Sequence, residues 1–403
     1  MTRPWLDIIG IGEEGVAGLM PASRAVLEAA EVVIGGDRHH ALTPEVSAER
    51  IAWPSPFDAL IDRLRALRGR RVVVLATGDP LWYSVGARIG RAIDRAEITF
   101  HPQLSAFQHA AARMGWSMAD CEQLTVHGRP VEQMIPFIAP AARLLILTTG
   151  SETPAQIAGI LAERGYGASK LTVLAAMGGA QEARFDGIAE GWEHKVPAFN
   201  SLAVECIASA GASVLPQMGL PDGCFVSDGT MTKQEVRAVT MAKLMPMRGA
   251  LLWDVGCGCG SVGVEWMRGA RDARAIGIEP RDDRRVLAAQ NALALGAPQL
   301  DLRAGQVPQA LAGLPAPDAV FIGGGLSIEA AEICHSVLKP LGRLVANAVT
   351  IESEMLLTRL QETYGGELSK IAVSRASPLG KGRGGPRGWR PAMAVTQWSL
   401  IKR

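Results

Sequence analysis

The chain has almost no net charge and few aromatic side chains. Its 403 residues include 41 Lys and Arg against 40 Asp and Glu, which leaves a formal net charge of +1, and aromatic residues make up 5%. Such a chain has no global electrostatic attraction to nucleic acid or to an anionic membrane. We therefore expect neither as a partner, and recognition of a charged ligand must depend on a local group of side chains.

Long apolar segments are also missing. No apolar run approaches the roughly 20 residues that a membrane-spanning helix needs. Residues 1–10 lead straight into an expected strand, without the apolar core and small-residue cleavage site of a signal peptide. These absences predict a cytoplasmic protein.

The six cysteines include no Cys-x-x-Cys pair, and Cys257 and Cys259 are the two that lie close together. Structural zinc sites generally use four ligands at other spacings. We interpret this pair as small residues in a tight loop, and we predict no metal site.

Strand-like apolar runs alternate with helix-like segments along the whole chain, which is typical of α/β proteins. A chain of 403 residues is too long for one ordinary core. Pro and Gly gather in residues 209–228, which we interpret as a linker between a domain of residues 1–208 and a domain of residues 229–403. The strands expected in the first domain are Leu6–Ile9, Val72–Ala76, Leu144–Thr148 and Leu171–Ala175.

The second domain has the more regular pattern. Five strand–helix units are followed by two late strands with no helix between them. This order suits a seven-stranded sheet whose last strand is antiparallel. The expected strands are Leu251–Val255, Ala275–Glu279, Asp301–Arg303, Ala319–Ile322, Leu344–Ala348, Leu368–Ser374 and Ala392–Leu400.

A glycine-rich loop follows the first strand of this domain and leads directly into a helix. Glycine lets the backbone turn sharply and approach a ligand, and the start of a helix presents free N–H donors. Glu279 ends the next strand, where a carboxylate can accept both ribose hydroxyls of an adenosine. The loop consists of Asp254, Val255, Gly256, Cys257, Gly258, Cys259 and Gly260.

These features fit an S-adenosylmethionine site or a dinucleotide site. Dehydrogenases carry Gly-x-Gly-x-x-Gly, whereas this loop has Gly-x-Gly-x-Gly with Asp254 two positions before it. Asp254 can pair with the amino group of an amino-acid moiety, which nicotinamide cofactors lack. We favour a methyltransferase that uses S-adenosylmethionine; a dehydrogenase and a purely structural glycine turn are the alternatives.

Two further segments of this domain hold candidate ligand contacts. Thr232-Lys-Gln-Glu235 has the spacing of a capping box, and Thr232 could contact the cofactor as well. The glycine-rich segment 380–390 concentrates positive charge. It is either a solvated hairpin or a set of cations that pair with the carboxylates of a polyanionic substrate. Its cations are Lys381, Arg383, Arg387 and Arg390, of which Lys381, Arg383 and Arg387 are the candidate substrate-binding residues.

The first domain carries loops at the expected carboxyl ends of its strands, where open α/β sheets bind ligands. Gly10-Ile-Gly-Glu-Glu-Gly15 follows the first strand, and Gly78-Asp-Pro80 follows the strand at Val72–Ala76. Leu124–Arg129 and Thr148–Gly150 are further loops of this kind. His127 is either a structural hydrogen-bonding group or a ligand contact, and Arg129 favours binding of an anion.

The first half, with these glycine, Gly-Asp-Pro and His-Gly-Arg loops, resembles the tetrapyrrole methylase superfamily. The second half resembles the precorrin methyltransferases that also remove a carboxyl group. The fused order resembles the precorrin-6Y C5,15-methyltransferase (decarboxylating) family of cobalamin biosynthesis. The motifs of the second half are Met231-Thr-Lys-x-Glu-Val-Arg237, Asp254-x-Gly-x-Gly-x-Gly260, Phe321-Ile-Gly-Gly-Gly325 and Asn347-Ala-Val-Thr350.

The resemblance implies a two-lobed tetrapyrrole methylase fold followed by a Rossmann-like, seven-stranded class I methyltransferase fold. It implies one S-adenosylmethionine site per domain and a tetrapyrrole substrate, precorrin-6Y. Carbon 5 is assigned to the first domain; carbon 15 and loss of the ring C acetate carboxyl as carbon dioxide, which gives precorrin-8X, are assigned to the second. We also expect a homo-oligomer, and no residue stands out as a general acid or base.

The resemblance also implies contacts residue by residue. In the second domain the cofactor contacts are Thr232, Gly256 to Gly260, Glu279 and the backbone near Val307. In the first domain they are Gly10, Gly12, Gly78, Asp79, Pro80, Ser105, Ala106, Thr148 and the region Met177–Gly179. Candidate substrate contacts are His127 and Arg129 in the first domain and Lys381, Arg383 and Arg387 in the second.

Three positions depart from the family pattern. Glu13 and Glu14 stand where much of the superfamily has Pro-Gly, the usual Gly is missing between Pro102 and Ser105, and Gln306 replaces an acidic residue before Val307. Two other functions stay open: methylation of another substrate such as RNA, and a binding or scaffolding role for one half. The near-neutral charge and the absence of an Asn-Pro-Pro-Tyr-type motif disfavour RNA.

Overall fold

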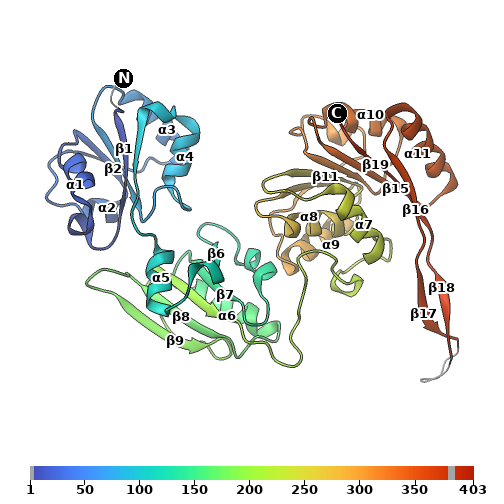
Figure 1. Ribbon diagram of the computed structural model, residues 1–403, viewed down its shortest axis with the longest axis horizontal. Coiled ribbons are helices and arrows are strands. Elements are labelled where there is room, and N and C mark those ends of the chain that lie inside the picture. The colour runs from blue at the N-terminus through green and yellow to red at the C-terminus, as the bar shows by residue number, and fades with distance from the viewer. Residues whose placement is uncertain (1–3, 380–385) are drawn as a thin grey trace. The chain divides into compact units, whose positions relative to one another are not determined.

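The computed structural model describes residues 4–379 and 386–403, and the chain folds into two compact units with their boundary in the sequence between Ser213 and Val214 (Figure 1). The short segment Glu132–Pro136 is grouped with the second unit. Each unit is an α/β structure, as the sequence predicts, and each has its own sheets and hydrophobic clusters.

The first lobe of the first unit contains a five-stranded parallel sheet. Its strand order is β3-β2-β4-β1-β5, with β1 at Leu6–Ile11, β2 at Val32–Gly35, β3 at Glu49–Ala52, β4 at Val72–Thr77 and β5 at Ile98–His101. Alternate residues of β1 enter two clusters: Leu6 and Ile8 one, Ile9 and Ile11 the other. Burial on both faces is the reason that β1 and β4 are mostly apolar, apart from Asp7 in β1 and the exposed Thr77 at the end of β4. The helices are α1 Pro21–Glu28, α2 Asp37–Ala41, α3 Leu60–Ala66 and α4 Val85–Ala92.

The second lobe contains a mixed sheet, so the first unit has the expected two-lobed architecture. The order is β6-β7-β10-β8-β9, and only the β6–β7 pair is parallel. Its strands are β6 Glu122–Thr125, β7 Arg143–Leu147, β8 Lys170–Ala175, β9 Ala183–Ile188 and β10 Asn200–Glu205, and its helices are α5 Ala106–Met114 and α6 Thr153–Glu163.

The second unit is built on a seven-stranded sheet in the order β13-β12-β11-β14-β15-β19-β16. The prediction of an antiparallel last strand is confirmed, because β19 runs antiparallel to both of its neighbours. The strands are β11 Leu251–Val255, β12 Arg274–Ile278, β13 Asp301–Arg303, β14 Ala319–Ile322, β15 Arg343–Ala348, β16 Glu367–Ile371 and β19 Val395–Ile401. The helices are α7 Gln234–Leu244, α8 Ser261–Gly269, α9 Asp282–Ala294, α10 Ile328–Val337 and α11 Ile351–Tyr364.

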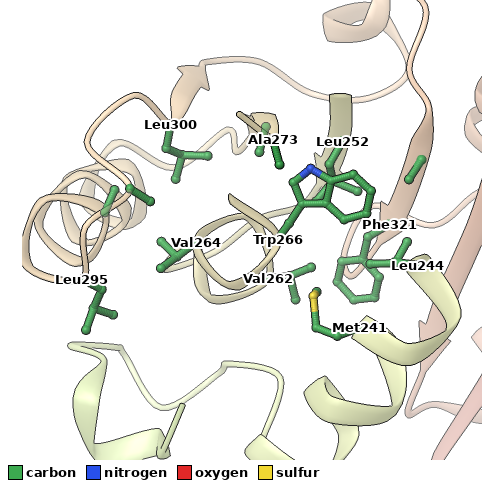
Figure 2. Close-up of a cluster of buried hydrophobic side chains, with 14 of the residues drawn as sticks. Met241, Leu244, Leu252, Val262, Val264, Trp266, Ala273, Leu295, Leu300 and Phe321 are labelled. Atoms are coloured by element: carbon green, nitrogen blue, oxygen red, sulfur yellow. The ribbon is translucent and has the colours of Figure 1, made fainter. Parts of the chain in front are cut away.

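Helices cover both faces of this sheet. On one face Trp266 of α8 lies beside Leu252 and Phe321 of the central strands, with Met241 of α7 close by (Figure 2). The other face packs Trp253 against residues of α10 and α11. Leu220 and Phe225 belong to the first of these clusters, so the later part of segment 209–228 is packed into the second unit.

A separate two-stranded ribbon extends from the second unit (Figure 1). It consists of β17 at Ser374–Pro378 and β18 at Arg387–Pro391, paired antiparallel with Arg375 opposite Arg390. The sequence predicts no helix between the two late strands and allows a hairpin at residues 380–390; β17 and β18 are not among its predicted strands. In the described residues no helix is long and apolar enough to cross a bilayer.

Candidate active site

A cavity of about 940 Å³ lies at the carboxyl ends of β11, β12, β14 and β15 in the second unit. The loops after parallel strands meet at one edge of the sheet, and this is the usual ligand-binding edge of open α/β sheets. The walls include residues 229–233, 256–258, 278–281, 305–307 and 323–325, with Asn347. Segments that are far apart in the sequence therefore enclose a single space.

The glycine loop requires glycine for two structural reasons. Gly256, Gly258 and Gly260 have φ values of +68°, +56° and +77°, which side chains other than glycine rarely adopt. A Cβ atom on Gly256 would lie 2.6 Å from the backbone of Gly324. The loop and the turn after β14 thus pack backbone against backbone. Gly260 then leads into α8, as predicted.

Glu279 is fixed by the backbone around it. Its Oε2 accepts a hydrogen bond from the Gly258 N–H at 3.0 Å, and its Oε1 accepts one from the Arg281 N–H at 3.1 Å. The side chain is almost fully buried, yet it lines the cavity. A carboxylate oxygen has further lone pairs, so this group can still accept hydroxyl donors from a ligand.

Asp254 has a different place from the one that the sequence suggests. It does not line the cavity; its Oδ2 accepts the Gly263 N–H of α8 at 2.8 Å, and its Oδ1 is buried without a partner. Burial raises its pKa to about 7. In this structure Asp254 ties the glycine loop to α8, and only its unpartnered Oδ1 is left for another donor.

The two cysteines of the loop also differ. Cys257 lines the cavity, whereas Cys259 is buried and its carbonyl accepts a hydrogen bond from Asn291 of α9 at 2.9 Å. Burial raises the pKa of both thiols. Among the described residues, no group of three or more His, Cys, Asp and Glu side chains could hold a metal ion.

The predicted capping box at Thr232 is wrong. Helix α7 begins at Gln234, one residue later than that pattern needs, and Lys233 at its N-cap makes no side-chain cap. The Gln234 N–H donates instead to Asp222 Oδ1 at 2.8 Å, while Glu235 pairs with Arg375 of β17. Distant partners therefore replace the local motif. Thr232 itself lines the cavity, as do Val307 and Gln306.

A buried ion pair that the sequence analysis missed holds this wall in place. Arg237 of α7 donates to Glu265 of α8 at 2.6 Å, and neither side chain is exposed. Arg237 also donates to the carbonyls of Thr232 and Leu220, and Glu265 accepts the N–H groups of Gly219 and Leu220. The signal for this ion pair in the sequence is that Arg237 and Glu265 are each flanked by apolar residues within a helix.

Several cations line the cavity, and most are neutralised. Arg281 and Arg284 pair with Asp228, and Arg375 pairs with Glu235 and Asp222. Lys233 and Arg390 also line the cavity, and neither has an acidic partner in the described part of the chain. Unpaired positive charge is therefore confined to these two residues of the cavity wall.

The substrate-binding residues expected in the late loop are only partly described. Lys381 and Arg383 lie outside the described residues. Arg387 is exposed at the outer end of β18 and does not line the cavity. Arg390, at the other end of the same strand, does so instead.

In the first unit, three of the predicted segments converge. A Cβ atom on Gly10 would overlap the carbonyl oxygen of Gly78, and one on Gly78 would lie 2.9 Å from the Cα of Ser105. The loops that follow β1, β4 and β5 therefore touch along their backbones. Ser105 caps α5 by accepting the Phe107 N–H at 3.2 Å, and Ala106 is the first residue of that helix. Asp79 accepts the Leu81 N–H at 2.7 Å, which shapes the loop through Pro80.

The second lobe brings its own predicted residues together. Thr148 donates to the backbone carbonyl of Asn200 at 2.7 Å, and Nδ1 of His127 hydrogen-bonds to the carbonyl of Thr148 at 3.1 Å. This hydrogen bond fixes the orientation of the His127 ring. The side chain of Arg129 is exposed. Met177 packs into the apolar cluster of this lobe.

Two acidic residues contact both lobes of the first unit. Glu14 lies against Gly12 and Gly178, and Glu13 lies against Gly179. The Gly178 N–H donates a hydrogen bond to Glu182. The hydrogen bonds from Arg113 and from this N–H lower the pKa of Glu182 to about 2. Glu13 and Glu14, one of the three departures from the family pattern, thus lie where the two lobes meet.

A polar cluster beside Glu13 was not found from the sequence. Glu13 pairs with Arg38, whose guanidinium donates to Thr77 Oγ1 at 2.7 Å and stacks 3.8 Å from the Phe199 ring centroid. His39 contacts the same hydroxyl at 3.0 Å, and burial lowers its pKa to about 4. Thr77 precedes the Gly-Asp-Pro loop, so this cluster supports that loop.

The two halves of the chain match two family models. Residues 6–190 match the model described as tetrapyrrole (corrin/porphyrin) methylases, and residues 223–402 match the precorrin methyltransferase domain. A precorrin-6Y C(5,15)-methyltransferase (decarboxylating) from Sinorhizobium sp. is 44% identical over 409 residues, which cover 100% of this chain and 97% of that protein. The protein of the same name from Mycobacterium tuberculosis is 36% identical and covers 98% of this chain and 99% of its own length.

A solved structure matches as well. The C-terminal domain of precorrin-6Y C5,15-methyltransferase from Rhodobacter capsulatus is 45% identical, with a TM-score of 0.44, and covers 47% of this chain and 100% of that one.

Proposed function

The chain belongs to the precorrin-6Y C(5,15)-methyltransferase (decarboxylating) family, and from this premise we propose that it methylates carbons 5 and 15 of precorrin-6Y and removes the ring C acetate carboxyl as carbon dioxide, giving precorrin-8X. Each unit holds one S-adenosylmethionine site in this proposal. The observation that carries it is the buried Glu279 carboxylate, which is fixed by the Gly258 N–H within the cavity of the second unit.

The cavity has room for the methyl donor. Its volume of about 940 Å³ lies near the upper end of the range for small-molecule sites, about 300–1,000 Å³. Glu279 accepts the ribose hydroxyls, and the loop at Gly305–Val307 contacts the adenine. The glycine loop lies against the amino-acid end of the cofactor. Thr232 contacts the same ligand from the opposite wall.

The chain's own part in the chemistry is mainly placement. When bound, S-adenosylmethionine supplies a methyl group that its sulfonium already activates. The reduced tetrapyrrole offers electron-rich carbons, so the cavity need only hold one of them in line with that methyl group. The turn Gly323–Gly325 has no side chains and packs against Gly256, which leaves open space between donor and acceptor.

Lys233 and Arg390 bind carboxylates of the tetrapyrrole in this proposal. The other cations of the cavity wall are paired with acids, and these two are not. The base of the ribbon is tied to α7 by the Arg375–Glu235 pair, and Arg390 lies directly across the ribbon from Arg375. Arg390 is therefore held near the start of α7, where Lys233 lies.

Charge-removing variants test this assignment. Lys233→Gln and Arg390→Gln should each raise the KM for the tetrapyrrole about tenfold, as expected for a lost charge-assisted hydrogen bond, and leave S-adenosylmethionine affinity unchanged. Arg387→Gln is the matched control on the same strand, outside the cavity wall. An equal KM for all three variants and the unchanged chain would contradict the role of the two wall cations.

The first unit supports a second site by its geometry. The loops at Gly10, Gly78 and Ser105 touch at the carboxyl edge of a parallel sheet, and Thr148 and Met177 of the second lobe belong to the same expected site. His127 and Arg129 are the candidate contacts for the tetrapyrrole here. We also propose that the protein is cytoplasmic and forms a homo-oligomer. Light scattering of the purified chain would test the oligomeric state.

The decisive experiment incubates the full chain with precorrin-6Y and S-adenosylmethionine and determines product masses. Two added methyl groups and one lost carbon dioxide are expected. Gly10→Ala should abolish only methylation at carbon 5, and Gly256→Ala only methylation at carbon 15 and decarboxylation, because each Cβ would collide with backbone of a neighbouring loop. If one variant left both methylations intact, the corresponding half would not be a catalytic unit.

A further inference from the structure

Three polar side chains form a hydrogen-bonded cluster beside the cavity of the second unit. Thr240 lies on α7, Asn347 near the end of β15 and Gln397 on β19. Asn347 Nδ2 donates to Thr240 Oγ1 at 3.1 Å, and Gln397 Nε2 donates to Thr240 Oγ1 at 3.1 Å and to Asn347 Oδ1 at 2.9 Å. Thr240 and Gln397 are completely buried, whereas Asn347 lines the cavity.

The direction of these bonds is determined by Thr240. Its hydroxyl donates to the Val236 carbonyl at 2.8 Å, so its oxygen can only accept from the two amides. Turning the Asn347 amide over would bring its oxygen against Thr240 Oγ1 and its nitrogen against the Gln397 nitrogen. Both contacts would be repulsive. The cluster therefore holds Asn347 in a single orientation.

Hydrogen-bonding capacity is left over in this cluster. An amide nitrogen carries two hydrogens, and one of those on Asn347 has no acceptor among the described residues, although the residue lines the cavity. Gln397 Oε1 is buried without a partner. Buried polar groups are generally satisfied in folded proteins, so a cluster with spare capacity at a cavity wall is suited to binding a ligand.

Asn347 lies in the half of the cavity away from the ribose acceptor. The strand order from Glu279 is β12-β11-β14-β15, and neighbouring strands are about 4.8 Å apart, which separates the ends of β12 and β15 by about 14 Å. A cofactor held at Glu279 therefore leaves the end of β15 to the methyl acceptor. The donor of Asn347 faces that second ligand.

We propose that Asn347 holds the acetate carboxylate that is lost as carbon dioxide; this rests on the proposed function of the second unit. The bond between the acetate methylene and the carboxylate carbon breaks, and its electron pair passes into the conjugated macrocycle. Carbon dioxide leaves, and the methylene carbon takes up a proton from water. Negative charge thus moves away from the carboxylate as the bond breaks.

The residue type suits this step. A cation beside the reacting carboxylate would stabilise the charged ground state more than the transition state and slow the reaction. The neutral amide of Asn347 orients the carboxylate without that penalty. Lys233 and Arg390 remain for the carboxylates that are retained. Thr240 and Gln397 are positioning residues, because they fix the amide and do not line the cavity.

The test compares full-length variants with the unchanged chain, using precorrin-6Y, S-adenosylmethionine and product mass. Asn347→Leu keeps the branched shape of the side chain but cannot donate. It should raise the ratio of product that retains the acetate carboxyl to decarboxylated product about tenfold, the effect of one lost hydrogen bond at the reacting group. Methylation at carbon 15 and S-adenosylmethionine affinity should stay within about twofold of the unchanged chain.

The positioning residue is tested by a matched set. Thr240→Val should raise the same ratio, because the acceptor that fixes Asn347 is gone, and Thr240→Ser should restore it. Thr363→Val is the control: Thr363 makes the same hydroxyl bond to a carbonyl four residues earlier, on α11, but holds no amide. It should leave the ratio unchanged.

Several results would overturn the proposal. An unchanged ratio in Asn347→Leu would remove the residue from the decarboxylation. Equal losses of methylation at carbon 15 and of decarboxylation would assign Asn347 to placing the whole macrocycle. A loss of S-adenosylmethionine binding in Asn347→Leu together with an unchanged ratio in Thr240→Val would make the cluster purely structural. If the unchanged chain itself neither methylated nor decarboxylated the tetrapyrrole, the proposed function would fail instead.

Discussion

Replacing Arg237 by Met should strongly destabilise the second unit. Arg237 and Glu265 are both completely buried, and the guanidinium also donates to the carbonyls of Thr232 and Leu220. Met keeps most of the apolar volume of the side chain but removes the charge. The Glu265 carboxylate would then stay buried, with only the N–H groups of Gly219 and Leu220 as partners.

The magnitude follows from the loss of one partner of a buried pair, which costs about 3–5 kcal/mol. For a unit of about 150–250 residues, each kcal/mol lowers the midpoint of thermal unfolding by about 2–4 °C. The Arg237→Met variant should therefore unfold its second unit about 6–20 °C below the unchanged chain. Calorimetry of the full chain measures this directly, because the first unit serves as an internal reference.

The control is Arg248→Met, which removes an exposed pair with Asp272 and should cost at most about 1 kcal/mol. The reasoning is refuted if both variants lower the midpoint equally. Arg237→Met should also weaken S-adenosylmethionine binding, since the wall that carries Thr232 is anchored through the Thr232 carbonyl.

Three more outcomes are expected. Glu279→Gln should weaken S-adenosylmethionine binding about 10- to 100-fold in calorimetric titration, because an amide cannot match the charge-assisted bonds of a carboxylate beside the Gly258 N–H; an unaltered affinity would exclude Glu279 as the ribose acceptor. Burial raises the pKa of Asp254 from 3.8 to about 7, so the folded chain retains a proton there that the unfolded chain releases, and this contribution to stability is present below about pH 4 and lost by about pH 7. Asp254→Asn should therefore be increasingly more stable than the unchanged chain across that interval, by up to about 4 kcal/mol in urea unfolding, and a constant difference would contradict the assignment. Arg375→Gln should hardly change stability, since its pair with Glu235 is exposed, but it should raise the tetrapyrrole KM by loosening the ribbon; an unchanged KM would show that the ribbon needs no tether.

The sheet of the second unit could be predicted because its signals are local. Most of the parallel strands are largely apolar runs between helical segments, and burial on both faces favours that pattern. The edge strand β13 is the exception, because it is short, polar and not buried. In the first unit, β2, β3, β5, β6, β9 and β10 were missed. The strand β9 alternates half-buried and exposed residues, and β3 is largely exposed at a sheet edge, so neither has a strong apolar signal.

The site residues divide in the same way. The glycine loop and Glu279 were found because a backbone with positive φ restricts the residue type locally, and because strand register places Glu279 beside it. Thr232 lines the cavity, but the capping box expected there does not form. Lys233 could be singled out only after the partners of the other cations were known, and Arg390 was expected only as one of several cations of segment 380–390.

By itself, the sequence determined the α/β class, the position of the glycine loop and the carboxylate that ends the next strand. These depend on apolar periodicity and backbone conformation, which act over a few residues. Only the tertiary structure decided which charged side chains are paired and which side-chain amides are fixed in one orientation by hydrogen bonds. Arg237 meets Glu265, and Asn347 meets Thr240 and Gln397, across long stretches of chain. Such partners are selected by the packing of helices on the sheet, and no local pattern encodes that packing.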